Sequence, residues 1–165
     1  MISYMRIIKL KRDDVLYPEL SYKIYGLCFE AQNELGRYLN EKQFCDYMES
    51  LLKRESIGYA REKPLPKSFE GERANRNIPD FVIEDLIIFD AKCKLYITRQ
   101  DYFQMQRYLN SYNKKLGIIV NFRERRINPR RVLNPNYKNV NDNEELIIEE
   151  IKNLDSKIKK LQKYS

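Results

Sequence analysis

Residues 77–94, NIPDFVIEDLIIFDAKCK, leave few choices for the fold of this chain. Two apolar runs on either side of a central Glu-Asp pair are typical of the strands of a buried β-hairpin. The same stretch holds Asp80, Asp90 and Lys92, and a charged side chain is costly to bury unless it is paired or binds an ion. The hairpin therefore predicts a sheet with charged side chains in it that are paired or bind an ion.

The rest of the chain alternates between helical and extended patterns. Apolar residues recur with the helical period in residues 19–35, 40–55, 99–112 and a last segment from about residue 143. Extended structure is expected as an exposed strand and loop within 57–77, a short buried strand at 115–122 and an edge strand at 127–135. Gly36 is expected to end the first helix, and Asn40 with Gln43 to cap the second. This order predicts an α/β fold with a mixed sheet flanked by helices and a C-terminal helical extension, divided into residues 1–135 and 136–165.

Composition narrows the chemistry that such a fold can carry. The 165 residues are 42% hydrophobic and 33% charged, which is typical of one globular domain with its own core. The chain has no histidine, so catalytic triads, His-ligated zinc and imidazole acid–base chemistry are excluded. A hydrolase of this composition would need carboxylates and a hard cation.

Cysteine usage and hydropathy bear on the location of the protein. Cys28, Cys45 and Cys93 are far apart in the sequence, which favours reduced thiols over a disulfide framework or a zinc site. No apolar run reaches the length of a membrane helix, and the N-terminus lacks the apolar region of a signal peptide. No membrane partner is therefore expected, and the expected location is the cytoplasm.

The net charge of +7 is unevenly distributed along the chain. Residues 136–165 are neutral, with six Lys and six acidic residues, so the excess belongs to residues 1–135. The densest basic stretch is RERRINPRR at 123–131, whose arginines include Arg125, Arg126, Arg130 and Arg131. Such a stretch suits a phosphate backbone, and a solvated basic face is the alternative.

The charges of the hairpin form a site only for one strand register. Asp90 and Lys92 are two residues apart and point to the same face of their strand. A two-residue turn would put Asp80 and Asp90 on opposite faces, whereas a three-residue loop or a bulge would put them side by side. Two facing carboxylates would share a proton or hold a cation, and oxygen ligands favour Mg²⁺ or Mn²⁺. A solvated strand end is the alternative reading of this spacing.

These residues match a known pattern when they are taken in order. PD at 79–80, followed by DAK at 90–92, resembles the motif of the PD-(D/E)XK nuclease superfamily. QMQRY at 104–108 resembles the QxxxY element that follows the core strands in exonuclease-type members. The resemblance covers about residues 15–135, and the ordered set of motifs is more specific than any one of them.

Upstream segments resemble the GxxExxY branch of that superfamily. The matching segments are GLCFE at 26–30, ELG at 34–36, LNE at 39–41 and, after the apolar strand, NF at 121–122. Tyr38 and Phe44 stand where the naming motif has Gly and Tyr, while Glu41 is kept.

The resemblance implies a restriction-endonuclease-like fold and a role for each matching residue. Asp80, Asp90 and the Ala91 carbonyl are the expected metal ligands, and Lys92 is the expected catalytic lysine. Glu41 is expected to be a further ligand or to position a water, with Glu30 as the alternative. Gln104 and Tyr108, four residues apart on one helical face, would support the site or contact nucleic acid.

The expected activity is Mg²⁺- or Mn²⁺-dependent hydrolysis of nucleic-acid phosphodiesters, with DNA favoured over RNA. Two other functions are open: an inactive nucleic-acid-binding module that keeps the nuclease fold, and an assembly subunit that acts through its C-terminal helix. In that helix, apolar residues follow a heptad spacing at Ile147, Ile151, Leu154, Ile158 and Leu161. The apolar stripe could pack on the domain or form a homodimer.

Overall fold

The computed structural model describes residues 16–139 and 151–154. Its elements follow the predicted order: α2 (Pro18–Leu35), α3 (Glu41–Arg54), β1 (Tyr59–Arg61), β2 (Phe81–Ile83), β3 (Ile87–Lys92), α4 (Arg99–Tyr112), β4 (Leu116–Asn121) and β5 (Arg130–Leu133). Each expected helix and strand up to residue 135 is present, and most boundaries differ by one to three residues from those read from the sequence.

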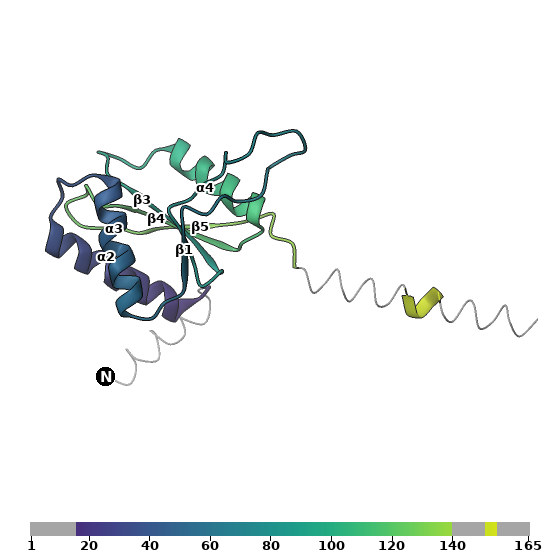
Figure 1. The fold of residues 1–165 in the computed structure, drawn as a ribbon, viewed down its shortest axis with the longest axis horizontal. Coiled ribbons are helices and arrows are strands. Elements are labelled where there is room, and N and C mark those ends of the chain that lie inside the picture. Colours follow the sequence, from purple (N-terminus) through teal and green to yellow (C-terminus); the bar gives the residue numbers. More distant parts are fainter. Residues whose placement is uncertain (1–15, 140–150, 155–165) are drawn as a thin grey trace, which may run out of the picture.

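The five strands form one mixed sheet in the order β1-β2-β3-β4-β5. Only β3 and β4 are parallel, and the other neighbouring strands are antiparallel. The parallel pair needs a crossover, which α4 supplies across one face of the sheet. Helices α2 and α3 cover the other face (Figure 1). The predicted mixed sheet flanked by helices is confirmed.

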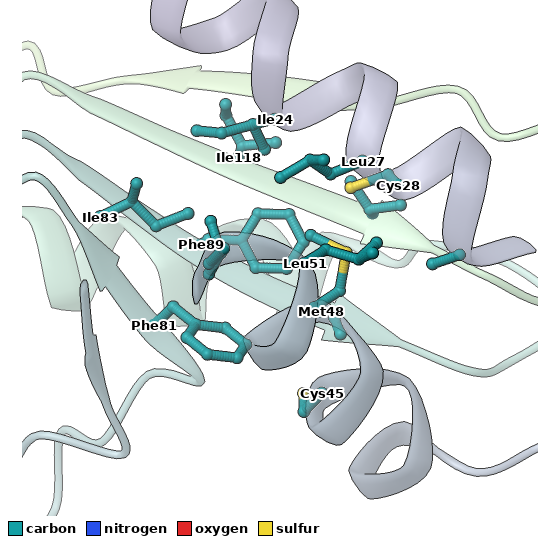
Figure 2. Packing of buried hydrophobic residues seen from close by; sticks show 14 of the residues in the cluster. Ile24, Leu27, Cys28, Cys45, Met48, Leu51, Phe81, Ile83, Phe89 and Ile118 are labelled. Carbon is teal, nitrogen blue, oxygen red and sulfur yellow. The ribbon is translucent and has the colours of Figure 1, made fainter. Parts of the chain in front are cut away.

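Alternate side chains of β3 pack against the two helical layers on opposite faces of the sheet. Ile87, Phe89 and Ala91 belong to the cluster under α2 and α3, which Figure 2 shows around Phe89, Met48 and Leu27. Ile88 belongs to the cluster under α4. Since Asp90 and Lys92 continue the alternation of Ile88, their side chains lie on the α4 face of the sheet.

Local sequence signals explain how the helices begin and end. Gly36 follows α2 with a φ of 78°, a left-handed conformation that glycine adopts without strain. Asn40 and Gln43 form the predicted capping box, with each side chain bonded to the other residue's backbone N–H. These two signals fix the start of α3, which carries Glu41 as its first residue.

Two further expectations concern thiols and membranes. Cys28, Cys45 and Cys93 are all free cysteines, as expected. Among the residues that the structure describes, no helix is long and apolar enough to cross a membrane. The helix predicted from about residue 143 falls largely outside the described residues. Only 151–154 are described there, and they are helical with exposed side chains.

Candidate active site

The hairpin between β2 and β3 has the three-residue loop that brings the two aspartates together. Ile83 pairs with Ile87, so Glu84, Asp85 and Leu86 lie between the strands. Glu84 and Asp85 have φ values of 51° and 53°, and the Leu86 N–H donates to the Ile83 carbonyl at 3.0 Å. The register places Asp80 opposite Asp90, immediately beyond the paired strands, on the same face of the sheet.

Backbone hydrogen bonds hold the two carboxylates at this position. The Asp80 N–H donates to Oδ1 of Asp90 at 3.2 Å, and the Ala91 N–H donates to Oδ2 of Asp80 at 2.7 Å. Asp90 is buried, with 5% of its surface exposed, whereas Asp80 is partly exposed. Asp90 is therefore bonded to the backbone of Asp80, and Asp80 to the backbone of Ala91, the residue after Asp90.

Lys92 joins this pair through its ammonium group. Its Nζ lies 2.9 Å from Oδ2 of Asp90 and donates to Oε1 of Gln104 at 2.8 Å. One turn further along α4, the Tyr108 hydroxyl donates to the Ile78 carbonyl at 3.1 Å. Helix α4 thus contacts the site at two points. Gln104 binds the Lys92 ammonium, and Tyr108 binds the backbone of the segment that precedes Asp80.

Burial and repulsion shift the ionisation of these groups. Desolvation, followed by the charge of Asp90, raises the pKa of Asp80 to about 7. Burial also raises the pKa of Asp90, against the opposing effect of Lys92. For Lys92, burial acts to lower the pKa, but the Asp90 carboxylate outweighs it and the pKa is raised. The group is a compact, partly dehydrated cluster in which the negative charge of two carboxylates is incompletely neutralised.

Glu41 and Glu30 occupy different surroundings. Glu41 is partly buried at the start of α3, and its pKa is raised by burial, with Lys92 lowering it and Asp90 raising it further. Its ionisation is thus influenced by the charges of the cluster. Glu30 instead binds Arg54, with Nη2 and Oε2 2.8 Å apart. The charges of the cluster therefore influence Glu41, whereas Glu30 is held in an ion pair with Arg54.

The donor chemistry of the cluster fits a hard divalent cation. Among the described residues no three His, Cys, Asp or Glu side chains form a preformed metal-binding group. A backbone carbonyl also faces the side on which Asp80 lies. The Lys92 carbonyl accepts from the Phe122 N–H at 2.8 Å, so the backbone polar groups of Lys92 face β4. Successive residues of a strand direct their N–H and carbonyl groups to opposite sides. The N–H and carbonyl of Ala91 therefore face the side where Asp80 lies. Oxygen atoms of this kind are the ligands that Mg²⁺ and Mn²⁺ prefer.

Asn121, from the NF segment quoted above, and the pair Thr98 and Asp101, which the sequence analysis did not single out, fix the chain after Lys92. Buried Asn121 accepts from the Lys94 N–H at 3.1 Å and donates to the Lys94 carbonyl at 2.7 Å. The Lys94 ammonium contacts Asp101 at 2.8 Å, and Asp101 also accepts from the Thr98 N–H at 2.7 Å. The capping-box spacing of Thr98 and Asp101 was the sequence signal that could have found this arrangement.

The four predicted nucleic-acid-binding arginines do not form one uniform surface. Arg125 and Arg126 are exposed, and Arg130 is near Glu124 at 3.4 Å. Arg131 points to α2, where it donates to Ser21 Oγ, the Tyr25 hydroxyl and the Leu16 carbonyl at 2.9–3.0 Å. Arg131 therefore links β5 to α2, and its role in the fold was not predicted.

Comparison with known proteins agrees with this geometry. A family model described as the PD-(D/E)XK nuclease superfamily matches residues 18–132, from the start of α2 to β5. No curated protein and no solved structure showed significant similarity to the chain. The five-stranded mixed sheet flanked by helices is consistent with the restriction-endonuclease-like fold of this superfamily. Because the match covers well over half of the sequence, the chain belongs to the PD-(D/E)XK nuclease superfamily.

Proposed function

We propose that this protein is a metal-dependent nuclease that hydrolyses phosphodiester bonds with Mg²⁺ or Mn²⁺. Members of its superfamily generally hydrolyse such bonds with divalent metal ions. The observation that carries the proposal is the side-by-side placement of Asp80 and Asp90, with the Lys92 ammonium held between Asp90 and Gln104. The upstream motifs support assignment to the GxxExxY branch.

Each residue of the cluster has a role that follows from its contacts. Asp80, Asp90 and the Ala91 carbonyl would hold the cation, with Glu41 as a further oxygen ligand or as the acceptor that orients a water. A bound Mg²⁺ or Mn²⁺ would supply Lewis-acid stabilisation of negative charge on a phosphate. Lys92 keeps its ammonium charged and would neutralise charge that develops on the phosphate. Gln104 positions Lys92, and Tyr108 positions the segment before Asp80.

The alternative function is an inactive nucleic-acid-binding module, and a cleavage assay distinguishes it from a nuclease. One reason to consider it is the replacement of the motif tyrosine by Phe44. In this fold Phe44 is fully buried and stacks on Phe122 with 4.3 Å between ring centroids. The apolar ring is thus explained by packing, and the replacement does not by itself favour a protein that has lost activity.

The proposal extends to substrate, assembly and location. DNA is favoured over RNA as the substrate, and Arg125 and Arg126, both exposed, would contact its phosphates. A homodimer through the C-terminal helix is proposed over packing of that helix on the domain, because Ile151 and Leu154 are 53% and 58% exposed. The cytoplasmic location stays a prediction.

The experiment that tests the function is incubation of purified protein with labelled DNA and RNA, single- and double-stranded, in Mn²⁺ or Mg²⁺. Cleavage is expected for at least one substrate, and a chelator should stop it. Asp90→Asn should cleave at least 100-fold more slowly, while Asp46→Asn, at a side chain that is 69% exposed, should behave as wild type. Failure of the folded wild-type protein to cut any substrate would contradict the proposal.

A further inference from the structure

Large apolar side chains are exposed on the segments that carry the residues of the candidate active site. Twelve large hydrophobic residues are exposed in the described part of the chain, and five of them lie within four positions of Glu41, Asp80, Lys92 or Gln104. These five, called here the apolar rim, are Tyr38, Ile78, Leu95, Tyr96 and Phe103. Scattered exposed hydrophobic residues are normal, but a concentration beside a charged cluster indicates a binding surface.

Helix α4 carries Phe103 next to Gln104, a residue of the candidate site. Phe103 is 50% exposed and directly precedes Gln104, whose side chain contacts Lys92 at 2.8 Å. Arg107 is exposed and lies four residues after Phe103, so the two side chains lie one above the other on the helix surface. An aromatic ring and a cation thus stand next to each other on the helix that holds the lysine.

The other two aromatic residues of the rim come from loops that both bond to residues at or just beyond the end of β4: Arg37 Nε donates to the Arg123 carbonyl, and Asn121 bonds to the Lys94 backbone. Tyr96 is 75% exposed in the segment after Lys92, which is anchored by both hydrogen bonds between Asn121 and the Lys94 backbone. Tyr38 is 88% exposed and three residues before Glu41, a separation of at most about 11 Å along the chain. The hydrogen bonds of Arg37 and Lys94 anchor the two loops, which reduces the entropic cost of binding through them.

Exposed cations accompany the rim. Lys42 follows Glu41, Arg99 begins α4, and Arg107 lies one turn beyond Phe103. Among the described residues no carboxylate forms an ion pair with any of these three side chains. Unpaired surface cations can neutralise phosphates and release their counterions.

From this arrangement we infer that the protein acts on single-stranded nucleic acid, whose unpaired bases stack on Tyr96, Phe103 and Tyr38 while a phosphate reaches the cluster. The inference rests on the proposed nuclease function and names its substrate class. In a duplex the bases are already stacked on one another, so their faces are closed to aromatic side chains. A single strand offers those faces, and its phosphates meet Lys42, Arg99 and Arg107.

Binding measured without cleavage tests the inference. Fluorescence anisotropy in EDTA would compare a labelled 20-nucleotide single strand with the duplex of the same sequence. The single strand is expected to bind at least ten times more tightly. Tyr96→Ala and Phe103→Ala should each weaken single-strand binding roughly 5- to 150-fold, the cost of one lost base–aromatic stack, and should change duplex binding by less than twofold. Tyr96→Phe, which keeps the ring, should bind as wild type.

Phe29→Ala is the matched control, because Phe29 is an aromatic residue 44% exposed on α2 that does not belong to the rim. It should change neither affinity, and thermal melts should show all variants folded. Equal affinity for duplex and single strand, or wild-type binding by both rim variants, would overturn the inference. So would a shift from dimer to monomer on Tyr96→Ala, which would make the rim a protein interface.

Cleavage in Mn²⁺ separates this inference from the function on which it rests. If the wild-type protein cuts the duplex and spares the single strand, the substrate class is wrong and the nuclease proposal stands. If it binds the single strand through the rim but cuts nothing, the binding surface stands and the nuclease proposal fails.

Discussion

At the scale of single residues, the Asp80 carboxylate is destabilised by burial and by repulsion from Asp90. Its carboxyl is drawn out of water and faces Asp90, and both effects raise its pKa to about 7 from an ordinary 3.8. The folded protein therefore holds this proton up to about pH 7, whereas the unfolded chain releases it near pH 4. Where the folded state binds more protons, the free energy of unfolding falls as pH rises.

The metal-free protein should accordingly lose stability between about pH 4 and pH 7 and change little above. Asp80→Asn keeps an oxygen for the Ala91 N–H and removes the repulsion, so its thermal unfolding in a chelator should depend less on pH. At pH 8 we expect it to exceed wild type by about 1–4 kcal/mol. A steeper pH dependence than wild type would contradict this account of the pair.

The register that makes this site could not be read from the sequence. Glu84 and Asp85 both adopt left-handed φ angles, which a turn built from Asn-Gly would have signalled. With neither Asn nor Gly present, the loop length stayed open, and with it the side to which Asp80 points. The contacts of Arg131 were unpredictable for a similar reason, because a basic run in the sequence does not show that one member turns inward to Ser21 and Tyr25.

At the scale of elements, the distance between α4 and the sheet depends on Gly117 in β4. A Cβ at this position would come within 2.6 Å of the Met105 side-chain Cγ, and Met105 is buried and adjacent to Gln104. The absence of a side chain at Gly117 lets α4 pack close enough to the sheet for Gln104 to contact Lys92. The strand and the helix were both predictable from their apolar periods, but the need for glycine between them was not.

Gly117→Ala should therefore destabilise the protein by about 1–3 kcal/mol, because Met105 must move within a packed core. Gly26→Ala is the matched control: Gly26 lies inside α2, and a Cβ there has no heavy atom within 4 Å. It should stabilise by about 0.5–1 kcal/mol through helix propensity. Denaturant unfolding of the two variants gives both values, and equal effects of the same sign would contradict this packing.

At the scale of the whole molecule, the positive charge should govern affinity for nucleic acid. Replacing Arg125 and Arg126 by Gln removes two exposed charges, so binding should weaken and the slope of log K against log salt should become shallower by about 1.4–1.8. Anisotropy titrations at several salt concentrations measure this slope. An unchanged slope in this double variant would show that Arg125 and Arg126 do not contact phosphates. Arg131→Gln should instead lower the melting temperature, because it removes the hydrogen bonds of Arg131 to Ser21, Tyr25 and Leu16.

The C-terminal segment is the second feature of the whole molecule that remains to be tested. The family match ends at residue 132, and only 151–154 of the predicted heptad region are described. We expect the full chain to be a dimer and a chain lacking residues 141–165 to be a folded monomer. Light scattering at micromolar concentration decides this, and a monomeric full-length chain would exclude self-association under those conditions.

The most direct measurement of the central claim is the rate at which Lys92→Ala cleaves a labelled oligonucleotide in Mn²⁺. Lys92 contacts both Asp90 and Gln104, yet it contributes little to the apolar core. The account predicts a folded variant that binds the oligonucleotide and cleaves it at least 100-fold more slowly than wild type. Lys53→Ala, at a side chain 67% exposed, should cleave at the wild-type rate. Cleavage by Lys92→Ala at the wild-type rate would contradict the assignment of this cluster as the active site.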